Sequence, residues 1–517
     1  MNILENKNID KVLVIDFGGQ YAHLIARRVR ELNIYSMIIS YSVVSKSLID
    51  RIKPKAIILS GGPSSVLQEN APSIGDWILD LGIPVLGICY GHQLLAKIIG
   101  GKVKVGRGEY GKTLIHIVER DPLFDGWNNG EYVWMSHRDY VAELPDNARV
   151  LALSENGYIA AFKLKDKLIY GVQFHPEVYH TRKGSMLLRN FLFSIAKVQP
   201  NWKVENLVED IIKDIKSKVK PNEKVLVAVS GGVDSTVTAL LVKKAIGERL
   251  VPVFVNHGLL REGEVDDVLR NLENLGIKPV YIDASKRFLQ RLKGVSDCEE
   301  KRKIIGEEFA KIFKEVVEGD PQIKWLAQGT TYPDVIESGS THGSDKIKSH
   351  HNVAGLPRWL GLKVLEPLRN FYKDEVRKLA LYLGVPRDLA WRHPFPGPGL
   401  AVRIIGEITE EKLRIVRRAS KIVEEVLRKH GLYDKVWQAF AVVGDDKWVG
   451  VKGDRRHHGY IVVIRIVESA DGMTADWARI PHEVLDEISR KIISEIPEVT
   501  MVTYAITTKP PSTIEPC

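Results

Sequence analysis

The feature that most constrains the fold is an alternation of short β-branched runs with helical patterns, which occurs twice along the chain. In the first half, strands are predicted at 12–16, 36–40, 56–60 and 84–88, with helices at 20–32 and 91–99. In the second half, strands are predicted at 224–229, 251–255, 278–283 and 323–328, with helical patterns between them. Such alternation favours parallel strands covered by helices. We therefore expect an α/β protein with two doubly wound, mainly parallel-sheet domains.

A small α+β domain is expected after these two units. The Pro/Gly-rich stretch 394–399 (PFPGPG) breaks the alternation. Beyond it, the patterns predict a helix at 409–430, a strand at 459–466, a helix at 481–495 and a strand near 500–506. The stretch 196–206 has the composition of a linker. We predict three domains, over residues 1–198, 205–393 and 394–517.

Composition favours a soluble protein that neither enters a membrane nor is secreted. Hydrophobic residues make up 44% and charged residues 27% of the chain, which is ordinary for globular proteins. No run of about 18 apolar residues occurs, and the first residues lack a signal-peptide pattern. The only cysteines are Cys89, Cys298 and Cys517. So sparse and odd a set argues against a disulfide framework and for a reducing, cytoplasmic setting.

Net charge leaves two interpretations open. The formal charge is +9, from 74 basic and 65 acidic residues. A basic surface can hold nucleic acid, whereas a generally charged surface with basic pockets suits small phosphates. Both signs are interspersed along the chain, so the second interpretation is favoured and no nucleic-acid partner is expected.

A candidate nucleophile lies where a buried strand turns into a helix. Residues 87–91 are Gly-Ile-Cys-Tyr-Gly, and small residues on either side of Cys89 permit a sharp turn that exposes its side chain. The following helix N-terminus favours a thiolate. The alternative is a buried structural cysteine, which is the common fate of a free thiol.

Two further motifs supply partners for this thiol. In G-V-Q-F-H-P-E (171–177), His175 can act as the base and Glu177 can orient its ring. The glycine turn Ser60–Pro63 follows a predicted strand, and the N–H groups of Gly62 and Tyr90 can stabilise an oxyanion.

A second candidate site opens the second alternating unit. Residues 230–235 are Ser-Gly-Gly-Val-Asp-Ser, directly between the strand KVLVAV and a helix. Main-chain N–H groups at a helix N-terminus bind anions, and the glycines allow close approach. No Walker A sequence occurs. The predicted phosphate contacts are Ser230, Gly231, Gly232, Val233, Asp234 and Ser235.

These motifs resemble two known families. Residues 10–195 are similar to the class I glutamine amidotransferases, which implies that Cys89 attacks the glutamine amide, with His175 as proton carrier and Glu177 as its orienting group. The 230–235 loop resembles that of the N-type ATP pyrophosphatases, which adenylate a substrate oxygen. That resemblance implies ATP and Mg²⁺ as reactants with no stably bound cofactor, Asp234 as a magnesium contact and Val255 at the adenine edge.

Later stretches narrow the resemblance to the GMP synthetase family. They include R-H-P-F-P-G-P-G-L-A-V-R-I-I-G-E (392–407) and T-K-P-P-S-T-I-E (508–515). The resemblance implies amination of xanthosine monophosphate (XMP) with ammonia from glutamine, in a homodimer formed by the C-terminal domain. It implies XMP contacts at Arg302, Gln438, Lys509 and Glu515. It also implies a mobile lid that carries Lys348, His350 and His351.

Departures from the family pattern and two rival functions remain. Arg138, Asn256 and Ala354 stand where other residues are usual in the family. A pyrophosphatase-loop tRNA-modifying enzyme would account for the loop and the positive charge but leaves Cys89, His175 and Glu177 without a role. A non-catalytic protein with vestigial nucleotide pockets would not need that same trio.

Overall fold

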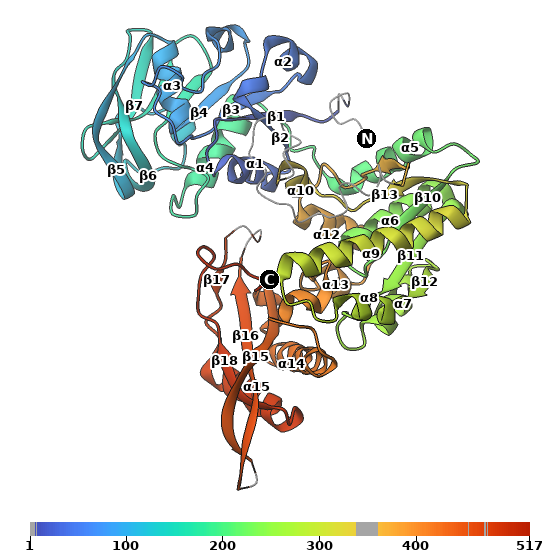
Figure 1. The fold of residues 1–517 in the computed structure, drawn as a ribbon. Coiled ribbons are helices and arrows are strands. Elements are labelled where there is room, and N and C mark those ends of the chain that lie inside the picture. Colours follow the sequence, from blue (N-terminus) through green and yellow to red (C-terminus); the bar gives the residue numbers. More distant parts are fainter. Residues whose placement is uncertain (1–5, 7, 338–359, 453, 470–471, 473) are drawn as a thin grey trace. The chain divides into compact units, whose positions relative to one another are not determined.

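The computed structural model describes residue 6 and residues 8–337, 360–452, 454–469, 472 and 474–517 (Figure 1). Its contacts divide the chain near Lys203 into an N-terminal and a C-terminal compact unit. The predicted fold class is confirmed: each unit contains a sheet rich in parallel strands, and a smaller sheet with antiparallel strands follows. Within the described residues, no helix is both long and apolar enough to span a bilayer.

The N-terminal unit is built on a nine-stranded sheet. Its order is β2-β1-β3-β4-β9-β8-β7-β5-β6, and the first five strands of that order are parallel. The strands are β1 (Lys11–Asp16), β2 (Tyr35–Ser40), β3 (Ala56–Leu59), β4 (Val85–Ile88), β5 (Lys102–Ile117), β6 (Gly130–Glu143), β7 (Ala148–Ser154), β8 (Ile159–Leu164) and β9 (Ile169–Val172). The helices are α1 (Ala22–Glu31), α2 (Lys46–Ile52), α3 (Tyr90–Ile98) and α4 (Gly184–Arg189). Strands β3, β4 and β9 are buried at every position, as expected of parallel strands covered on both faces.

Strands β5 to β8 were not predicted. They extend the parallel sheet with antiparallel pairs. β5 is exposed or half-buried at most positions and contains several lysines and glycines. It therefore lacks the apolar run by which buried strands are recognised.

The stretch predicted to be a linker is packed where it leaves the N-terminal unit. Trp202 is only 2% exposed, and its N–H donates to the carbonyl oxygen of Asn33 at 2.9 Å. Its ring lies 4.8 Å from that of Tyr35, centroid to centroid, and the Arg30 guanidinium sits 4.7 Å from the Trp202 ring. An aromatic anchor of this kind fixes the end of the unit.

The C-terminal unit begins with a five-stranded, wholly parallel sheet. Its order is β12-β11-β10-β13-β14. The strands are β10 (Lys224–Ala228), β11 (Leu250–Asn256), β12 (Val280–Asp283), β13 (Ile323–Ala327) and β14 (Lys363–Leu365). The helices of this part are α5 (Val208–Lys218), α6 (Val233–Ile246), α7 (Glu264–Asn274), α8 (Ser285–Leu292), α9 (Cys298–Gly319), α10 (Tyr332–Glu337), α12 (Lys373–Tyr382) and α13 (Arg387–Ala390).

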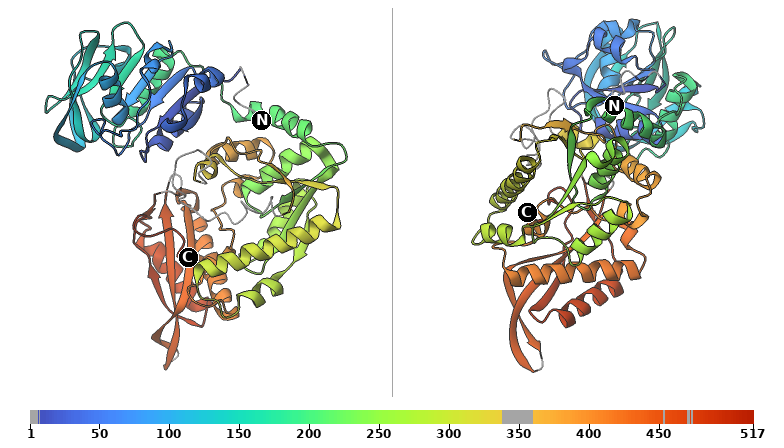
Figure 2. Two further views of the ribbon diagram at one scale, coloured as in Figure 1. Left: turned by 45° about the horizontal axis from the view of Figure 1, so that its top comes forward. Right: turned by 90° about the vertical axis from the view of Figure 1, so that its right-hand side faces the viewer.

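A second, smaller sheet completes this unit. The long hairpin of β15 (Gln438–Lys452) and β16 (Arg455–Glu468) pairs with β17 (Asp476–Trp477) and β18 (Val499–Tyr504). Helices α14 (Glu410–Lys429) and α15 (His482–Glu495) lie beside it (Figure 2). Thr409 caps α14 by accepting from the N–H of Lys412 at 3.2 Å, so the helix begins where the sequence predicts.

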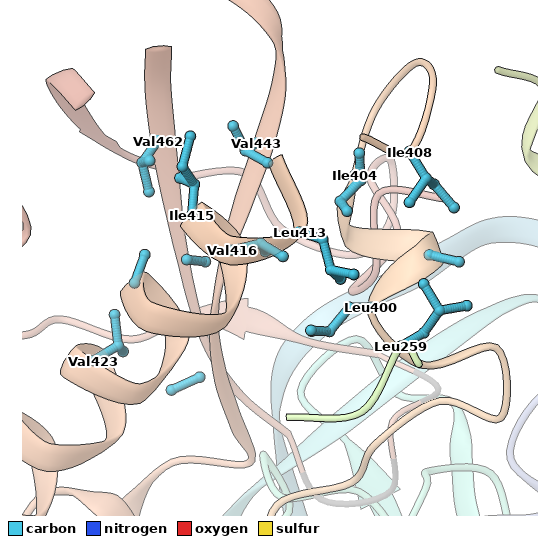
Figure 3. Close-up of a cluster of buried hydrophobic side chains, with 14 of the residues drawn as sticks. Leu259, Leu400, Ile404, Ile408, Leu413, Ile415, Val416, Val423, Val443 and Val462 are labelled. Atoms are coloured by element: carbon cyan, nitrogen blue, oxygen red, sulfur yellow. The ribbon is translucent and has the colours of Figure 1, made fainter. Parts of the chain in front are cut away.

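One hydrophobic core runs through both sheets of the C-terminal unit. Figure 3 shows Leu259, from the first sheet's connections, beside Leu400 and Ile404, which follow the Pro/Gly-rich stretch. The N–H of Leu400 donates to the carbonyl oxygen of Leu259 at 2.8 Å. At Gly399, with φ +64°, a Cβ would come within 2.4 Å of that same oxygen. The Pro/Gly-rich stretch therefore holds the two sheets of this unit together. The domain boundary at 393/394 stays a prediction.

The sparse cysteines argue against a disulfide framework, but the structure contains one disulfide. Cys298 and Cys517 are disulfide-bonded, with their Cα atoms 5.4 Å apart, although 219 residues separate them. Only the folded chain brings the two thiols together, so their spacing in the sequence gave no sign of it. Cys89 is free and buried.

Candidate functional site

Cys89 occupies a strained turn between β4 and α3. Its φ is +53°, a backbone conformation that side chains with a Cβ rarely adopt. A Cβ on Gly87 would lie 2.5 Å from the carbonyl oxygen of Gly91, and one on Gly91 would lie 2.6 Å from Leu59. Both glycines are thus required by close backbone approach, as the sequence predicts for a nucleophile elbow.

His175 and Glu177 form a buried pair just beyond β9. The ring Nδ1 of His175 lies 2.7 Å from Oε1 of Glu177, and both side chains are almost fully buried. Burial alone would lower the pKa of His175, but the negative charges of Glu177 and Cys89, with hydrogen bonds to both, raise it well above its ordinary value. These interactions favour the protonated form of the imidazole.

The structure brings the predicted nucleophile, base and oxyanion groups together. A Cβ built on Gly61 would lie 3.2 Å from Cε1 of His175 and 3.6 Å from Cβ of Cys89. The side chains of His175 and Cys89 therefore both lie next to Gly61. One built on Gly62 would lie 3.4 Å from the ring of Tyr90. Ser60 fixes this turn by accepting from the N–H of Phe17 at 3.1 Å and donating to the carbonyl oxygen of Gly61 at 2.8 Å.

A group of polar residues on β6 lies beside the thiol of Cys89, and the sequence analysis did not predict it. Sγ of Cys89 lies 3.7 Å from the carbonyl oxygen of Ser136. The next residue, His137, pairs through Nε2 with Oε2 of Glu109 at 3.0 Å, and both side chains are buried. Gln93 donates to the carbonyl oxygen of Asp139 at 2.7 Å. In this stretch the sequence analysis singles out only Arg138, whose side chain is exposed and pairs with Asp139 at 3.6 Å.

The 230–235 loop has the expected place between β10 and α6. Ser235 Oγ accepts from the N–H of Ser230 at 3.1 Å and donates to the carbonyl oxygen of Gly232 at 3.1 Å. Gly231 has φ +77°, and a Cβ there would lie 2.2 Å from Val268. The loop therefore needs glycine, and it presents the start of α6 at the carboxyl edge of the sheet, where α/β proteins bind nucleotides.

Two cations that sequence reasoning missed face this loop from α12. Lys373 forms an ion pair with Oδ2 of Asp234. Arg377 lies one helical turn after Lys373. Burial lowers the pKa of its guanidinium, although the negative charges of Asp234 and Asp374 act to raise it. The other carboxylate oxygen of Asp234, Oδ1, is buried without a hydrogen-bond partner. The unpartnered carboxylate oxygen suits a Mg²⁺ ion, and the neighbouring cations suit the phosphates of a triphosphate.

Val255 lies on the strand next to the loop. Ala228, the last residue of β10, pairs in register with Val253, so Val255 stands two residues further towards the carboxyl edge. Its own partner on β12 is Ile282. Asn256 then turns the chain by accepting from the N–H of Gly258 at 3.0 Å. The position is compatible with the predicted adenine contact, which stays a prediction.

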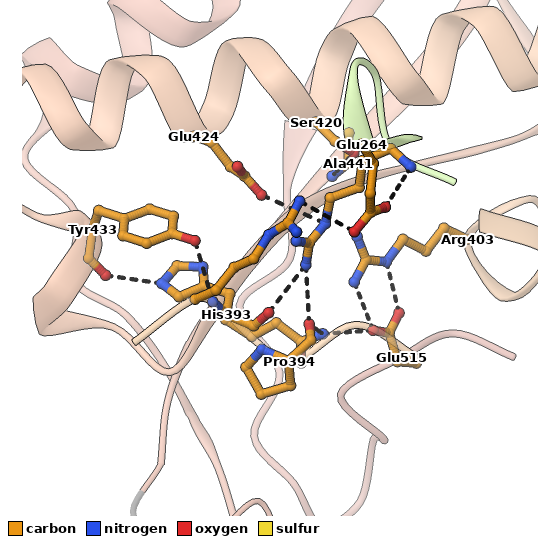
Figure 4. A network of polar contacts seen from close by, with 12 residues as sticks. Glu264, His393, Pro394, Arg403, Ser420, Glu424, Tyr433, Ala441 and Glu515 are labelled. Carbon is orange, nitrogen blue, oxygen red and sulfur yellow. Dashed lines mark hydrogen bonds and ion pairs between the residues drawn. The ribbon is translucent and has the colours of Figure 1, made fainter. Parts of the chain in front are cut away.

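Gln438 and Glu515, which are both predicted XMP contacts, lie against each other and beside Arg403, which the sequence analysis did not single out. Arg403 binds both carboxylate oxygens of Glu515, at 3.1 and 2.9 Å (Figure 4). Nε2 of Gln438 donates to Oε1 of Glu515 at 2.6 Å and to the carbonyl oxygen of Pro394 at 3.2 Å. Beside them the ring of His393 stacks on Tyr433, and burial lowers the pKa of His393 to about 4. This neutral histidine fixes the turn that supplies the Pro394 oxygen.

Arg302 contacts the C-terminal segment, residues 505–517, and Lys509 belongs to it. A guanidinium nitrogen of Arg302 donates to the main-chain oxygen of Cys517. Nζ of Lys509 donates to the carbonyl oxygen of Gly472 at 2.8 Å, and its main chain pairs with Ala475. All four predicted XMP contacts are thus on, or against, residues 505–517.

The predicted lid residues Lys348, His350 and His351, with Ala354, lie outside the described residues. Asp334, at the start of α10, accepts from the N–H and the hydroxyl of Thr331 at 2.8 and 2.7 Å. Within the described part of the chain, no group of three or more His, Cys, Asp or Glu side chains is arranged to hold a metal ion.

Three families match successive parts of the chain. Residues 13–195 match Glutamine amidotransferase class-I, residues 204–310 match NAD synthase, and residues 425–516 match GMP synthase C terminal domain. The first match contains Cys89, His175 and Glu177, the second the 230–235 loop, and the third Gln438, Lys509 and Glu515.

Relatives match along the whole chain. A glutamine-hydrolysing GMP synthase from Pyrobaculum aerophilum is 62% identical over 510 residues, covering 98% of this chain and 100% of its own length. One from Thermotoga maritima is 52% identical over 506 residues, covering 98% and 99%. Among solved structures, a glutamine amidotransferase from Thermotoga maritima aligns with a TM-score of 0.31 at 22% identity, covering 36% of this chain and 98% of that one.

Proposed function

Because this chain belongs to the glutamine-hydrolysing GMP synthases, we propose that its two sites carry the two halves of that ligase reaction. Ammonia from glutamine aminates XMP at C2 through an adenylated XMP, giving GMP, AMP, pyrophosphate and glutamate. Residues 1–198 would carry the glutaminase half, residues 205–393 the adenylating half, and residues 394–517 part of the XMP site. The observation that carries this division is the separation of the Cys89 elbow and the 230–235 loop into different compact units.

In the glutaminase half, the sulfur of Cys89 attacks the side-chain carbonyl of glutamine. His175, whose protonated form is favoured by its neighbours, gives its proton to the departing ammonia and then takes one from the water that hydrolyses the thioester. Glu177 keeps the ring oriented through Nδ1. The N–H groups of Gly62 and Tyr90 would stabilise the oxyanion that forms on the glutamine carbonyl.

In the adenylating half, the 230–235 loop binds the pyrophosphate part of ATP. Lys373 and Arg377 add positive charge beside it, which stabilises the phosphate oxygens as the bond between the α and β phosphates breaks. Asp234 would hold the Mg²⁺ that accompanies ATP, and that ion would neutralise phosphate charge. Adenylation turns the XMP oxygen into a good leaving group, which ammonia then displaces as AMP.

Arg302, Gln438, Lys509 and Glu515 form the proposed XMP site. The two cations suit the nucleotide phosphate, and the amide and carboxylate suit purine or ribose hydrogen bonds. Arg403 is a positioning residue, because it orients the Glu515 carboxylate by two hydrogen bonds.

We also propose that the enzyme is a homodimer built on the C-terminal sheet. The β15–β16 hairpin exposes Trp448, Val449 and Val451, which are 53%, 42% and 74% exposed. Apolar side chains grouped on a long hairpin favour association with a second copy. Sedimentation of the full-length protein tests this, and a monomer at micromolar concentration would contradict it.

A cytoplasmic location and the absence of a nucleic-acid partner are further proposals. Both rest on the small-molecule substrates of the reaction. The tRNA-modifying alternative is not favoured, because the chain matches GMP synthases along 98% of its length.

One assay tests the proposed function directly. The protein is incubated with ATP, Mg²⁺, XMP and glutamine, and GMP, AMP and pyrophosphate are measured. Equal yields of the three products are expected. Release of inorganic phosphate in place of pyrophosphate, or unchanged XMP with abundant ammonium, would overturn the assignment of the loop.

A further inference from the structure

Residues 505–517 lie outside any strand or helix but are fastened along their length. Arg465 donates to the carbonyl oxygens of Thr507 and Thr513, at 2.6 and 3.2 Å. Lys509 pairs with Ala475 through both its N–H and its carbonyl oxygen, at 2.7 and 3.1 Å. These contacts hold the segment in place although it forms no continuous β-ladder.

The end of this segment is held by three different kinds of bond. Glu515 is gripped by Arg403, the main-chain oxygen of Cys517 accepts from Arg302, and Sγ of Cys517 is bonded to Sγ of Cys298. The first two contacts involve side chains of the proposed XMP site or its support. The third is covalent and involves no nucleotide-binding side chain.

Cys298 and Arg302 stand on the same face of α9. Cys298 is its first residue, and Arg302 follows four positions later, close to one helical turn. The disulfide therefore ties the segment to the same strip of helix surface that presents Arg302. Asp297 anchors this end of the helix by accepting from the N–H of Glu300 at 2.8 Å.

We infer that the Cys298–Cys517 disulfide positions the XMP site: it keeps residues 505–517 docked on α9 so that Arg302, Lys509 and Glu515 stand ready before XMP arrives. The inference rests on the proposed function, which assigns these residues to XMP. Without the cross-link, nucleotide binding has to order the segment as well, and that entropy cost weakens binding. With it, much of the cost is met during folding.

The cross-link is open to thiol chemistry. Both cysteines are partly exposed, and their Cα distance of 5.4 Å falls in the range of ordinary disulfides. A small dithiol supplies two electrons and two protons: the S–S bond breaks, two protein thiols form, and the dithiol becomes a cyclic disulfide. A small disulfide reverses the exchange. The affinity for XMP is then tied to the redox state of this pair.

The test uses full-length enzyme with ammonium in place of glutamine, so that Cys89 takes no part in turnover. Peptide mapping by mass spectrometry first verifies the 298–517 cross-link and its loss after treatment with dithiothreitol. We expect reduction to raise KM for XMP about tenfold, with KM for ATP and kcat changed less than about threefold, because only the ordering of the XMP segment is affected.

Cysteine variants provide the matched control. Cys298→Ser and Cys517→Ser should each show the raised KM for XMP without treatment, and neither should respond further to dithiothreitol. Faster proteolysis within residues 505–517 should accompany the change. An effect of the reductant that persists in both variants would show that the response does not come from the Cys298–Cys517 disulfide and would overturn the inference.

Three other outcomes are decisive. An unchanged KM for XMP after verified reduction, or a verified absence of the cross-link, overturns the positioning role. A parallel loss of kcat and of both affinities assigns the disulfide to general stability, which also overturns it. No GMP in either redox state contradicts the proposed function itself, which separates its failure from failure of this inference.

Discussion

The guanidinium of Arg403 holds both carboxylate oxygens of Glu515, 112 residues further along the chain. The arginine side chain is only 2% exposed, so this carboxylate compensates a buried charge. A planar fork opposite a carboxylate fixes orientation as well as distance. The pair therefore sets the position of the C-terminal segment within the C-terminal unit.

Replacing Arg403 by lysine should impair XMP use selectively. Lysine keeps the charge but loses the two-pronged contact, so Glu515 is held less firmly. We expect KM for XMP to rise about tenfold or more, with glutaminase activity and KM for ATP little changed. Steady-state kinetics with each substrate varied in turn would check this. An equal loss of XMP and ATP affinity would mean that the pair only stabilises the fold.

Cys89→Ala should abolish glutamine-dependent synthesis and spare ammonium-dependent synthesis. In the proposed reaction the thiol is the nucleophile of one half-reaction only, and the 230–235 loop belongs to the other compact unit. GMP formation with glutamine and with high ammonium would be measured side by side. Loss of both activities would refute the division between two sites.

Glu177→Gln should shift the pH dependence of glutamine hydrolysis. The Glu177 charge is one of the interactions that raise the pKa of His175. Neutralising it lowers that pKa, so the protonated imidazole is lost at lower pH. The alkaline limb of kcat/KM for glutamine should therefore move to lower pH, with activity at neutral pH reduced at least about 100-fold. Glu69→Gln, an exposed change in the same unit, serves as control, and a profile unchanged in the Glu177 variant would contradict the assigned role.

Asp234→Asn should stop adenylation without touching glutamine hydrolysis. The change removes the partner of Lys373 and a charged oxygen that is buried without a hydrogen bond. Ammonium-dependent AMP release should fall by at least about 100-fold, a typical loss when transition-state charge is no longer balanced. Glu248→Gln, exposed just past the far end of α6, should leave AMP release unchanged. Normal AMP release by the Asp234 variant would remove the loop from the mechanism.

Trp202→Ala should destabilise the N-terminal unit. Its buried ring packs on Tyr35 and under the Arg30 guanidinium, and deleting such a side chain costs about 3–5 kcal/mol. Chemical denaturation followed by fluorescence and circular dichroism would measure the loss. Tyr110→Ala, at a position 68% exposed, should cost less than about 0.5 kcal/mol. A similar small cost at Trp202 would show that the segment is a true linker.

The sequence by itself determined the chemistry of both sites. The elbow around Cys89, the His175–Glu177 pair and the 230–235 loop each lie within a few consecutive residues. At Cys89 and at the 230–235 loop, strand–turn–helix geometry then fixes how the side chains point. The parallel strands were predictable for a related reason, because burial on both faces leaves a continuous apolar run.

Only the tertiary structure decided which distant residues complete these sites. Lys373 meets Asp234 across 139 residues, Glu515 meets Arg403 across 112, and Cys517 meets Cys298 across 219. The exposed strand β5 likewise finds its place only by pairing with β6 and β7. Local propensity carries no record of such contacts, since they form when packing of the whole core closes long loops at once.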